Sequence, residues 1–174
     1  ASSFLIKMYD TSRIVSIAWA VCDNNGTVLN EEYSYIKPTD FTIDNDSDAT
    51  KINGITQELA IEKGRDINEL MDLLLTDLES VDTLIAHNID FDFHILLSEL
   101  YRYKRQDIRD KLKHMKRYCT MENGTPVAKI DGKYGYKWPK LTELYTHLFD
   151  ETFDAHDAQE DVKACLKCYF KMEK

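Results

Sequence analysis

Two neighbouring segments rich in β-branched and aromatic residues constrain the fold of this chain most strongly. They are residues 13–23 (RIVSIAWAVCD) and 27–36 (TVLNEEYSYI), and residues 24–26 (NNG) connect them. Because Asn and Gly tolerate positive φ, this connection predicts a β-hairpin. A shorter apolar run at residues 2–6 (SSFLI) precedes the hairpin and indicates one more strand. The chain is therefore expected to begin with an antiparallel sheet.

Helical and strand patterns alternate along the rest of the chain. Residues 66–79 carry apolar side chains at helical spacing, and residues 83–86 (TLIA) indicate a short buried strand. This alternation after an antiparallel start predicts the α/β class: three layers, with a mixed sheet of about five strands and helices on both faces. At 174 residues, we expect one domain spanning residues 1–174. The remaining predictions are helices at 91–103, 140–148 and 157–173, a brief strand at 118–121, and irregular structure at 40–50 and 124–140.

An uneven charge distribution narrows the kinds of partner. The net charge is −9, which excludes a polycation that coats nucleic acid. Residues 101–117 nevertheless hold eight Lys or Arg and two acidic residues. An acidic body with one basic segment suits a protein that holds metal ions and contacts phosphates locally. A solvated helical face explains the same charges, and the sequence leaves both interpretations open.

The cysteines and the apolar runs indicate in which cellular compartment the protein is expected. Cys22, Cys119, Cys165 and Cys168 are too scattered for a disulfide framework, so we expect four reduced thiols. No apolar run approaches the ~20 residues of a membrane span, and the N-terminus lacks a signal-peptide pattern. We therefore expect an intracellular protein, cytoplasmic or nuclear, without a membrane segment.

Asp92 is the first candidate for chemistry. It ends the run AHNIDFD (residues 86–92), which follows a predicted buried strand at the point where a helix begins. Ligands of open α/β sheets gather outside the carboxyl ends of strands. A carboxylate there can bind a hard cation such as Mg²⁺. The alternative is that Asp92 only caps the helix.

His156 and Asp161 form the second candidate pair. Asp157 followed by Glu160 resembles a capping box, which predicts a helix start at residue 157. His156 then lies just outside the helix and Asp161 just over one turn inside it. A histidine beside a metal-bound carboxylate is suited to taking a proton from an attacking water. The alternative is a surface histidine beside a helix start.

Together these segments match a known pattern. AHNIDFD is similar to the second motif, and HDAQED (residues 156–161) to the third, of the DEDDh family of 3′–5′ exonucleases. The segments KINGIT (51–56) and KWPKLTELYTHLF (137–149) also resemble that family, as does RIVSIAWAVCD. The family has the ribonuclease H-like fold and includes proofreading subunits of bacterial replicative DNA polymerases.

The resemblance implies a mechanism and a set of site residues. In such enzymes, carboxylates hold two divalent cations, Mg²⁺ or Mn²⁺, that flank the scissile phosphate. It implies a single-stranded or frayed 3′ end of DNA as the substrate, RNA as an alternative, and a polymerase as a candidate partner. By residue, it implies Asp92 and Asp161 as metal ligands, His156 as the general base, Asn88 as support of the strand end, Gly54 and Ile55 as lining of the cleft for the 3′-terminal nucleotide, and Ile55 as the side chain that packs on its base.

The family's first motif, D-x-E at the end of the first strand, is absent from this sequence. After SSFLI the chain runs through KMYDTS (residues 7–12), where Asp10 is the single acid and Ser12 stands in place of a glutamate. Three explanations are open: the natural protein has a further segment between Ile6 and Lys7, the motif is lost, or Asp10 is the lone ligand of a one-metal site. The second gives the alternative function, an inactive module that binds nucleic acid or a polymerase. For the sequence as given, we expect negligible Mg²⁺-dependent hydrolysis.

Aromatic and lysine residues interleave at residues 133–140 (KYGYKWPK). Such a pattern suits stacking of bases beside a cleft, and it equally suits a loop packed on the core. We expect Trp138 to pack on the core, because it precedes Pro139 and a helix, and leave Tyr134 and Tyr136 open. His87 shows no partner pattern in the sequence and is expected to be structural.

Overall fold

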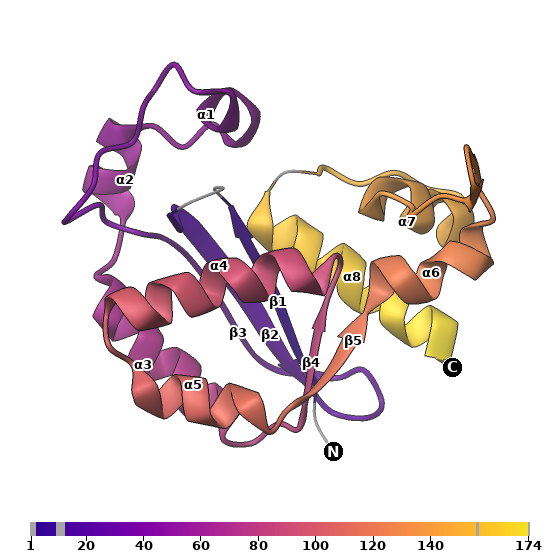
Figure 1. Cartoon of the computed structure of the whole chain (residues 1–174), viewed down its shortest axis with the longest axis horizontal. Helices are drawn as coiled ribbons and strands as arrows, with labels where there is room; N and C mark the ends of the chain where they lie inside the picture. The colour runs from indigo at the N-terminus through magenta and orange to yellow at the C-terminus, as the bar shows by residue number, and fades with distance from the viewer. Residues whose placement is uncertain (1–2, 10–12, 156, 174) are drawn as a thin grey trace.

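The computed structural model describes residues 3–9, 13–155 and 157–173. Its five-stranded sheet has the order β3-β2-β1-β4-β5, and helices lie on both sides of it (Figure 1). The strands of this sheet are β1 (Ser3–Tyr9), β2 (Ser16–Cys22), β3 (Val28–Tyr35), β4 (Thr83–Ala86) and β5 (Lys116–Cys119). The other elements are α1 (Asp48–Asn53), α2 (Gln57–Lys63), α3 (Ile67–Leu78), α4 (Ile89–Arg102), α5 (Gln106–Lys113), α6 (Thr120–Ala128), α7 (Leu141–Phe149) and α8 (Ala158–Glu173), with a small hairpin of β6 (Asp131–Gly132) and β7 (Gly135–Tyr136).

The directions of the strands define one functional edge of the sheet. β1 is antiparallel to β2 and parallel to β4, and β4 is parallel to β5. The carboxyl ends of β1, β4 and β5 therefore lie together, beside the amino end of β2. We call this side of the sheet the carboxyl edge. It is the place where open α/β sheets bind ligands.

Side-chain alternation along β2 builds the two cores. Ile17, Trp19 and Val21 pack into a cluster with side chains of α3, α4 and α5. Ala18 and Ala20 belong to the opposite cluster, with side chains of α8. Because successive strand residues point to opposite faces, one strand separates the two helical layers. The predicted three-layer α/β fold, with a mixed five-stranded sheet, is confirmed.

Some element boundaries differ from the sequence-based expectations. β1 continues past residue 6 to Tyr9, in unbroken register with β2 down to Ser16. Residues 124–128, predicted to be irregular as part of the segment 124–140, are helical in α6. A Cβ at Gly124 would lie 2.8 Å from a side-chain carbon of Leu144 in α7, so the absent side chain permits close contact between the two helices.

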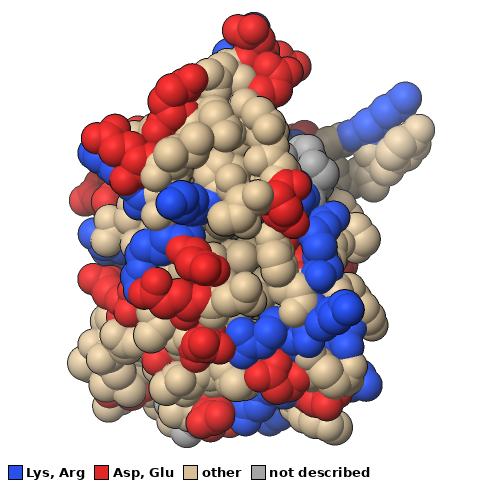
Figure 2. All heavy atoms as spheres, turned by 90° about the vertical axis from the view of Figure 1, so that its left-hand side faces the viewer, with Lys and Arg blue, Asp and Glu red and all other residues tan. Residues whose placement is uncertain are grey.

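The basic segment, residues 101–117, lies at the end of the sheet opposite the carboxyl edge. α5 lies in the middle of it, and the segment leads into the amino end of β5. Several of its cations are paired: Arg105 with Asp72 at 2.9 Å and Arg102 with Glu99 at 3.1 Å. Figure 2, turned to the left-hand side of Figure 1, shows basic side chains gathered at the lower right and acidic ones at the top. This placement favours the solvated-face interpretation of the segment.

None of the helices in the described ranges combines the length and the apolar character needed to span a membrane.

Candidate active site

Asp92 lies in the first turn of α4, which begins directly after β4 at the carboxyl edge. The N-cap of α4 is Asn88, in a left-handed conformation (φ 63°), and its side chain makes no capping hydrogen bond. Asp92 is therefore not the N-cap, and its side chain is completely buried. Aspartate is almost never fully buried unless it is paired or binds a metal. The capping alternative fails, and Asp92 stays a candidate metal ligand.

Asp161 occupies the first turn of α8. Asp157 caps this helix: its Oδ1 accepts hydrogen bonds from the backbone N–H groups of Gln159 (2.9 Å) and Glu160 (3.1 Å). The predicted start of the helix is thus correct to within one residue, and Asp161 is buried one turn inside it. His156 lies outside the described residues, so its role as a general base stays a prediction.

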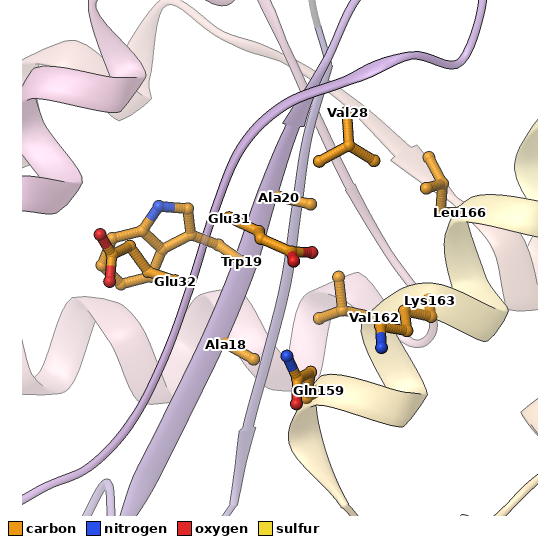
Figure 3. Close-up of a pocket in the computed structure, with 10 residues that line it drawn as sticks. All are labelled: Ala18, Trp19, Ala20, Val28, Glu31, Glu32, Gln159, Val162, Lys163 and Leu166. Carbon is orange, nitrogen blue, oxygen red and sulfur yellow. The ribbon is translucent and has the colours of Figure 1, made fainter.

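Small side chains on β2 fix the position of α8. Ala18 and Ala20 face the helix and pack near Val162, whereas the indole of Trp19 points to the other side of the strand (Figure 3). The cavity left between β2, β3 and α8 holds only about 20 Å³, so the contact is close. Tight packing of this kind leaves little freedom for the helix start.

The two buried carboxylates share one edge of the sheet from opposite faces. α8 begins beside Ser16, at the amino end of β2, while α4 begins after Ala86, at the end of β4. Both positions belong to the carboxyl edge. Asp161 approaches this edge from the α8 layer and Asp92 from the α4 layer. The structure therefore places these two predicted ligands at the same end of the sheet.

A hollow of about 240 Å³ opens at this edge, and we call it the edge hollow. It lies between the segment KINGIT and the start of α8, and Ile55 lines it whereas Gly54 does not. Its walls come from segments far apart in the sequence, so no local motif reveals it. The lining residues are Ser16, Tyr33, Tyr35, Ile52, Asn53, Ile55, Asp154, Ala155, Asp157 and Ala158.

The segment KINGIT forms one wall of the hollow through a tight turn. Gly54 ends α1 with φ 72°, and its N–H donates to the carbonyl of Thr50 at 2.7 Å. The Oδ1 of Asn53 accepts from the N–H of Ile55 at 2.8 Å, which fixes the turn further. Left-handed φ is costly for residues with a Cβ, so the turn favours glycine here.

Ile52, not considered in the sequence analysis, offers more apolar surface than the predicted Ile55. Ile55 is buried in a cluster with Val15 and Ala60, although it borders the hollow. Ile52 is 60% exposed and lines the same hollow. Of the two isoleucines, Ile52 is therefore the one whose exposed side chain can more readily contact a base in the hollow.

The electrostatics of the hollow favour cations and hydrogen-bond donors. Asp154 and Asp157 line it with carboxylates. Burial, a hydrogen bond to Tyr35 and the negative charge of Asp157 raise the pKa of the Tyr33 hydroxyl. Tyr33 therefore stays protonated at neutral pH, and its hydroxyl proton is held by the hydrogen bond to Tyr35.

The two carboxylates suit a cation that is coordinated partly by the protein and partly by a substrate, and not one coordinated by protein side chains alone. Asp92 and Asp161 supply hard oxygen ligands, and Mg²⁺ is usually held by one or two carboxylates together with substrate phosphates. In the described part of the chain, no group of three or more His, Cys, Asp or Glu side chains is arranged to hold a metal ion.

The place of the missing D-x-E motif can be located in the sheet. Leu5 pairs with Ile85, one residue before β4 ends, so the later residues of β1 extend past the end of β4. These residues are Lys7, Met8 and Tyr9, and none is acidic. Asp10 and Ser12 lie outside the described residues. The carboxyl end of β1 therefore contributes no carboxylate in the described ranges.

The four cysteines are buried and form no disulfide, so the expectation of reduced thiols is confirmed. Burial, with smaller contributions from nearby acids, raises the pKa of Cys22 to about 11, and burial raises that of Cys168 to about 12. Both thiols are protonated at neutral pH, which disfavours a metal or redox role.

Comparison with known proteins identifies the family. The model of the exonuclease family RNase_T matches residues 6–169. The DNA polymerase III subunit epsilon of Treponema pallidum (strain Nichols) is 26% identical over 163 residues, covering 94% of this chain and 69% of that protein.

Solved structures agree on the fold. E. coli exonuclease I in complex with a dA16 oligonucleotide superposes with a TM-score of 0.79 at 20% identity, over 99% of this chain and 40% of that one. The moderately thermophilic exonuclease I from Methylocaldum szegediense gives 0.74 at 21%, with the same coverage of 99% and 40%. The chain thus spans well under half the length of these solved exonucleases. Because the family model matches residues 6–169, the chain belongs to the exonuclease family, and within it to the DEDDh type.

Proposed function

We propose that this protein is a metal-dependent exonuclease that removes nucleotides from the 3′ end of single-stranded or frayed DNA. The observation that carries the proposal is the placement of Asp92 and Asp161, both buried, at the carboxyl edge from which the edge hollow opens. Buried carboxylates beside an open hollow are an arrangement suited to cation-assisted phosphodiester hydrolysis.

Each residue has a distinct role in this proposal. Asp92 and Asp161 would hold divalent cations, Mg²⁺ or Mn²⁺. Such a cation, when bound, would polarise the scissile phosphate and lower the pKa of a water molecule. His156 would accept the proton of the attacking water. Asn88 supports the turn between β4 and α4 that presents Asp92.

The edge hollow receives the terminal nucleotide. Gly54 shapes its wall, Ile55 and Ile52 give it an apolar surface, and the hydroxyl oxygen of Tyr33 can accept a hydrogen bond. The names of two relatives support the choice of substrate and partner. The E. coli relative was solved with a DNA oligonucleotide, and the T. pallidum relative is a polymerase subunit. We extend both to this chain as proposals: single-stranded DNA as substrate and a polymerase as partner.

The test compares variants at the buried acids with variants at their exposed or partly exposed neighbours. Asp92→Asn and Asp161→Asn are expected to abolish Mn²⁺-dependent release of nucleotides from a labelled single strand. Asp90→Asn, in the same turn as Asp92 but exposed, and Glu160→Gln, next to Asp161, are the matched controls and should keep activity. Equal activity in all four variants would contradict the assignment of Asp92 and Asp161.

A second candidate function is binding of nucleic acid without hydrolysis. The residues at the carboxyl end of β1, Lys7 to Tyr9, include no acid, and this observation favours it. The intact mass of the protein purified from its natural source separates the explanations. A mass above that of the sequence, traced to extra residues between Ile6 and Lys7, would indicate that the natural protein contains the first motif. A matching mass, together with DNA binding and no turnover, favours the second function.

A further inference from the structure

A strip of exposed aromatic side chains runs along the β6–β7 hairpin and the residues after it. Tyr134 is 92% exposed, Tyr136 is 52% exposed and Trp138 is 63% exposed. The expectation that Trp138 packs on the core is therefore wrong. Three exposed aromatic rings at alternate positions are a surface that a protein rarely leaves without a ligand. We call residues 133–138 the aromatic strip.

The strip is held in place at its base, close to the carboxyl edge. The Nε2 of His87, directly after β4, lies 2.8 Å from the carbonyl oxygen of Pro139. The backbone N–H of Lys137 donates to the carbonyl of Ile130 at 2.8 Å, which closes the hairpin. Its Nζ also donates to Glu143 at the start of α7, at 3.0 Å. The strip thus projects from the α6–α7 side of the molecule (Figure 1) and starts beside the turn that presents Asp92.

Charge accompanies the aromatic rings. Lys129, Lys133 and Lys140 are exposed around the strip, and the Nζ of Lys133 lies 5.5 Å from the ring centre of Tyr134. Asp131 is the single acid in residues 129–140 of a chain whose net charge is −9. This local positive surface lies next to the carboxyl edge, whereas the basic segment around α5 lies at the other end of the sheet.

We propose that the aromatic strip binds single-stranded DNA upstream of the end held in the edge hollow. Lysines that attract the backbone, with aromatic rings on which successive bases stack, are the two parts of sequence-tolerant single-strand binding. This inference rests on the proposed function for the direction of the strand. A protein partner is the competing occupant of the same surface.

The two tryptophans provide a direct readout. Trp19 is completely buried, and its Nε1 donates to Asp77, whereas Trp138 is exposed on the strip. An oligothymidylate of about 20 nucleotides should quench the emission of Trp138 while that of Trp19 persists. The titration is done in EDTA, so it needs no hydrolysis. Trp138→Phe should remove most of the quenching while the anisotropy of labelled DNA still reports binding.

Alanine variants test the contribution of each ring. Tyr134→Ala and Trp138→Ala should each weaken binding of the oligothymidylate by about tenfold, as expected for loss of one stacked base. Tyr101→Ala, a tyrosine 65% exposed on α4 and outside the strip, is the matched control and should not change binding.

Two results would overturn the inference. One is an affinity for the long oligothymidylate that is the same in Tyr134→Ala, Trp138→Ala and Tyr101→Ala. The other is no binding of the long strand at low salt, which would leave the strip to a protein partner. Neither result depends on turnover. If the strip binds DNA and the protein does not hydrolyse it, only the proposed function is refuted. If the protein hydrolyses DNA and the strip variants bind it as the unaltered protein does, only this inference is refuted.

Discussion

The imidazole of His87 joins the end of β4 to Pro139, with its Nε2 2.8 Å from the proline carbonyl oxygen. A carbonyl only accepts hydrogen bonds, so Nε2 carries the proton in this contact. The Nδ1, 2.9 Å from the hydroxyl of Thr120, is then the acceptor in the neutral ring. One side chain thus ties the central sheet to α6 and to the loop that carries the aromatic strip. These two contacts, with Pro139 and Thr120, agree with the structural role expected for His87.

Replacing His87 should loosen this loop. His87→Ala removes both hydrogen bonds, and we expect a loss of about 1–3 kcal/mol in the free energy of unfolding. Trypsin should then cleave after Lys133 and Lys137 faster in His87→Ala than in the unaltered protein. His94→Ala, at an exposed position of α4, is the control. Urea unfolding and limited trypsin digestion measure the two effects, and identical digestion of both variants would refute the tether.

A buried ion pair between Arg13 and Glu99 anchors the start of β2 to α4. The Nε of Arg13 donates to Oε1 of Glu99 at 2.9 Å, and Glu99 is buried. Arg102 also contacts Glu99, at 3.1 Å, so Arg13→Met leaves this carboxylate one remaining cation, and the variant should cost about 2 kcal/mol in urea unfolding, as for loss of a hydrogen bond to a charged group.

Arg65→Met provides the comparison for this pair. Arg65 lies 2.7 Å from Glu69, but both side chains are at least a third exposed. Exposed pairs contribute about 0–1 kcal/mol, so this variant should unfold at nearly the same urea concentration as the unaltered protein. Equal costs for Arg13→Met and Arg65→Met would show that burial does not decide the difference.

The start of α7 should make stability depend on pH. The carboxylate of Glu143 accepts from the backbone N–H of Lys140 at 2.9 Å, and this bond, against a partial desolvation cost and with help from Lys137, lowers its pKa. A lowered folded pKa stabilises the protein above the unfolded value, about 4.3, and this contribution is lost as the pH falls through the folded pKa.

Glu143→Gln isolates that contribution. The variant should be less stable than the unaltered protein at pH 7, and the difference should shrink as the pH falls below about 4.3. Urea unfolding of both proteins across this range measures it. A difference that is constant with pH would mean that the charge of Glu143 contributes nothing.

At Gly54 there is room for a side chain, but the left-handed backbone conformation disfavours any residue that has a Cβ. A Cβ at this position would meet no atom within 4 Å, yet φ is 72°. Gly54→Ala should therefore cost about 1–2 kcal/mol, through the backbone alone. Gly54→Asn should cost less, because asparagine tolerates left-handed φ. An asparagine variant no more stable than the alanine variant would contradict this reading of the turn.

The sequence predicts the parts of the structure that local patterns control. The alternation in β2 and the apolar spacing of α3 appear in the structure nearly where they were expected. α6 was missed because Pro126 and Gly124 disfavour a helix locally, whereas packing of Gly124 against α7 outweighs that preference. The exposure of Trp138 was missed because a tryptophan before a helix usually packs inward.

The candidate site divides in the same way. Asp92 and Asp161 are candidates that motif and position suggest, because each lies in the first turn of a helix whose start is predictable. Tyr33 and Ile52 could not be found, since they line the edge hollow only after β3, α1 and α8 come together. A contact of that kind leaves no spacing in the sequence.

The most direct test of the central claim is the polarity of hydrolysis. A single-stranded DNA labelled at its 5′ end is incubated with Mn²⁺ and the protein in the form that its natural source makes, with Asp161→Asn as the control. We expect a ladder of shortened strands that all keep the label, and no ladder in the variant or in EDTA. Release of the label as a mononucleotide at the outset would contradict action from the 3′ end. An unshortened strand in both Mg²⁺ and Mn²⁺ would contradict hydrolysis itself.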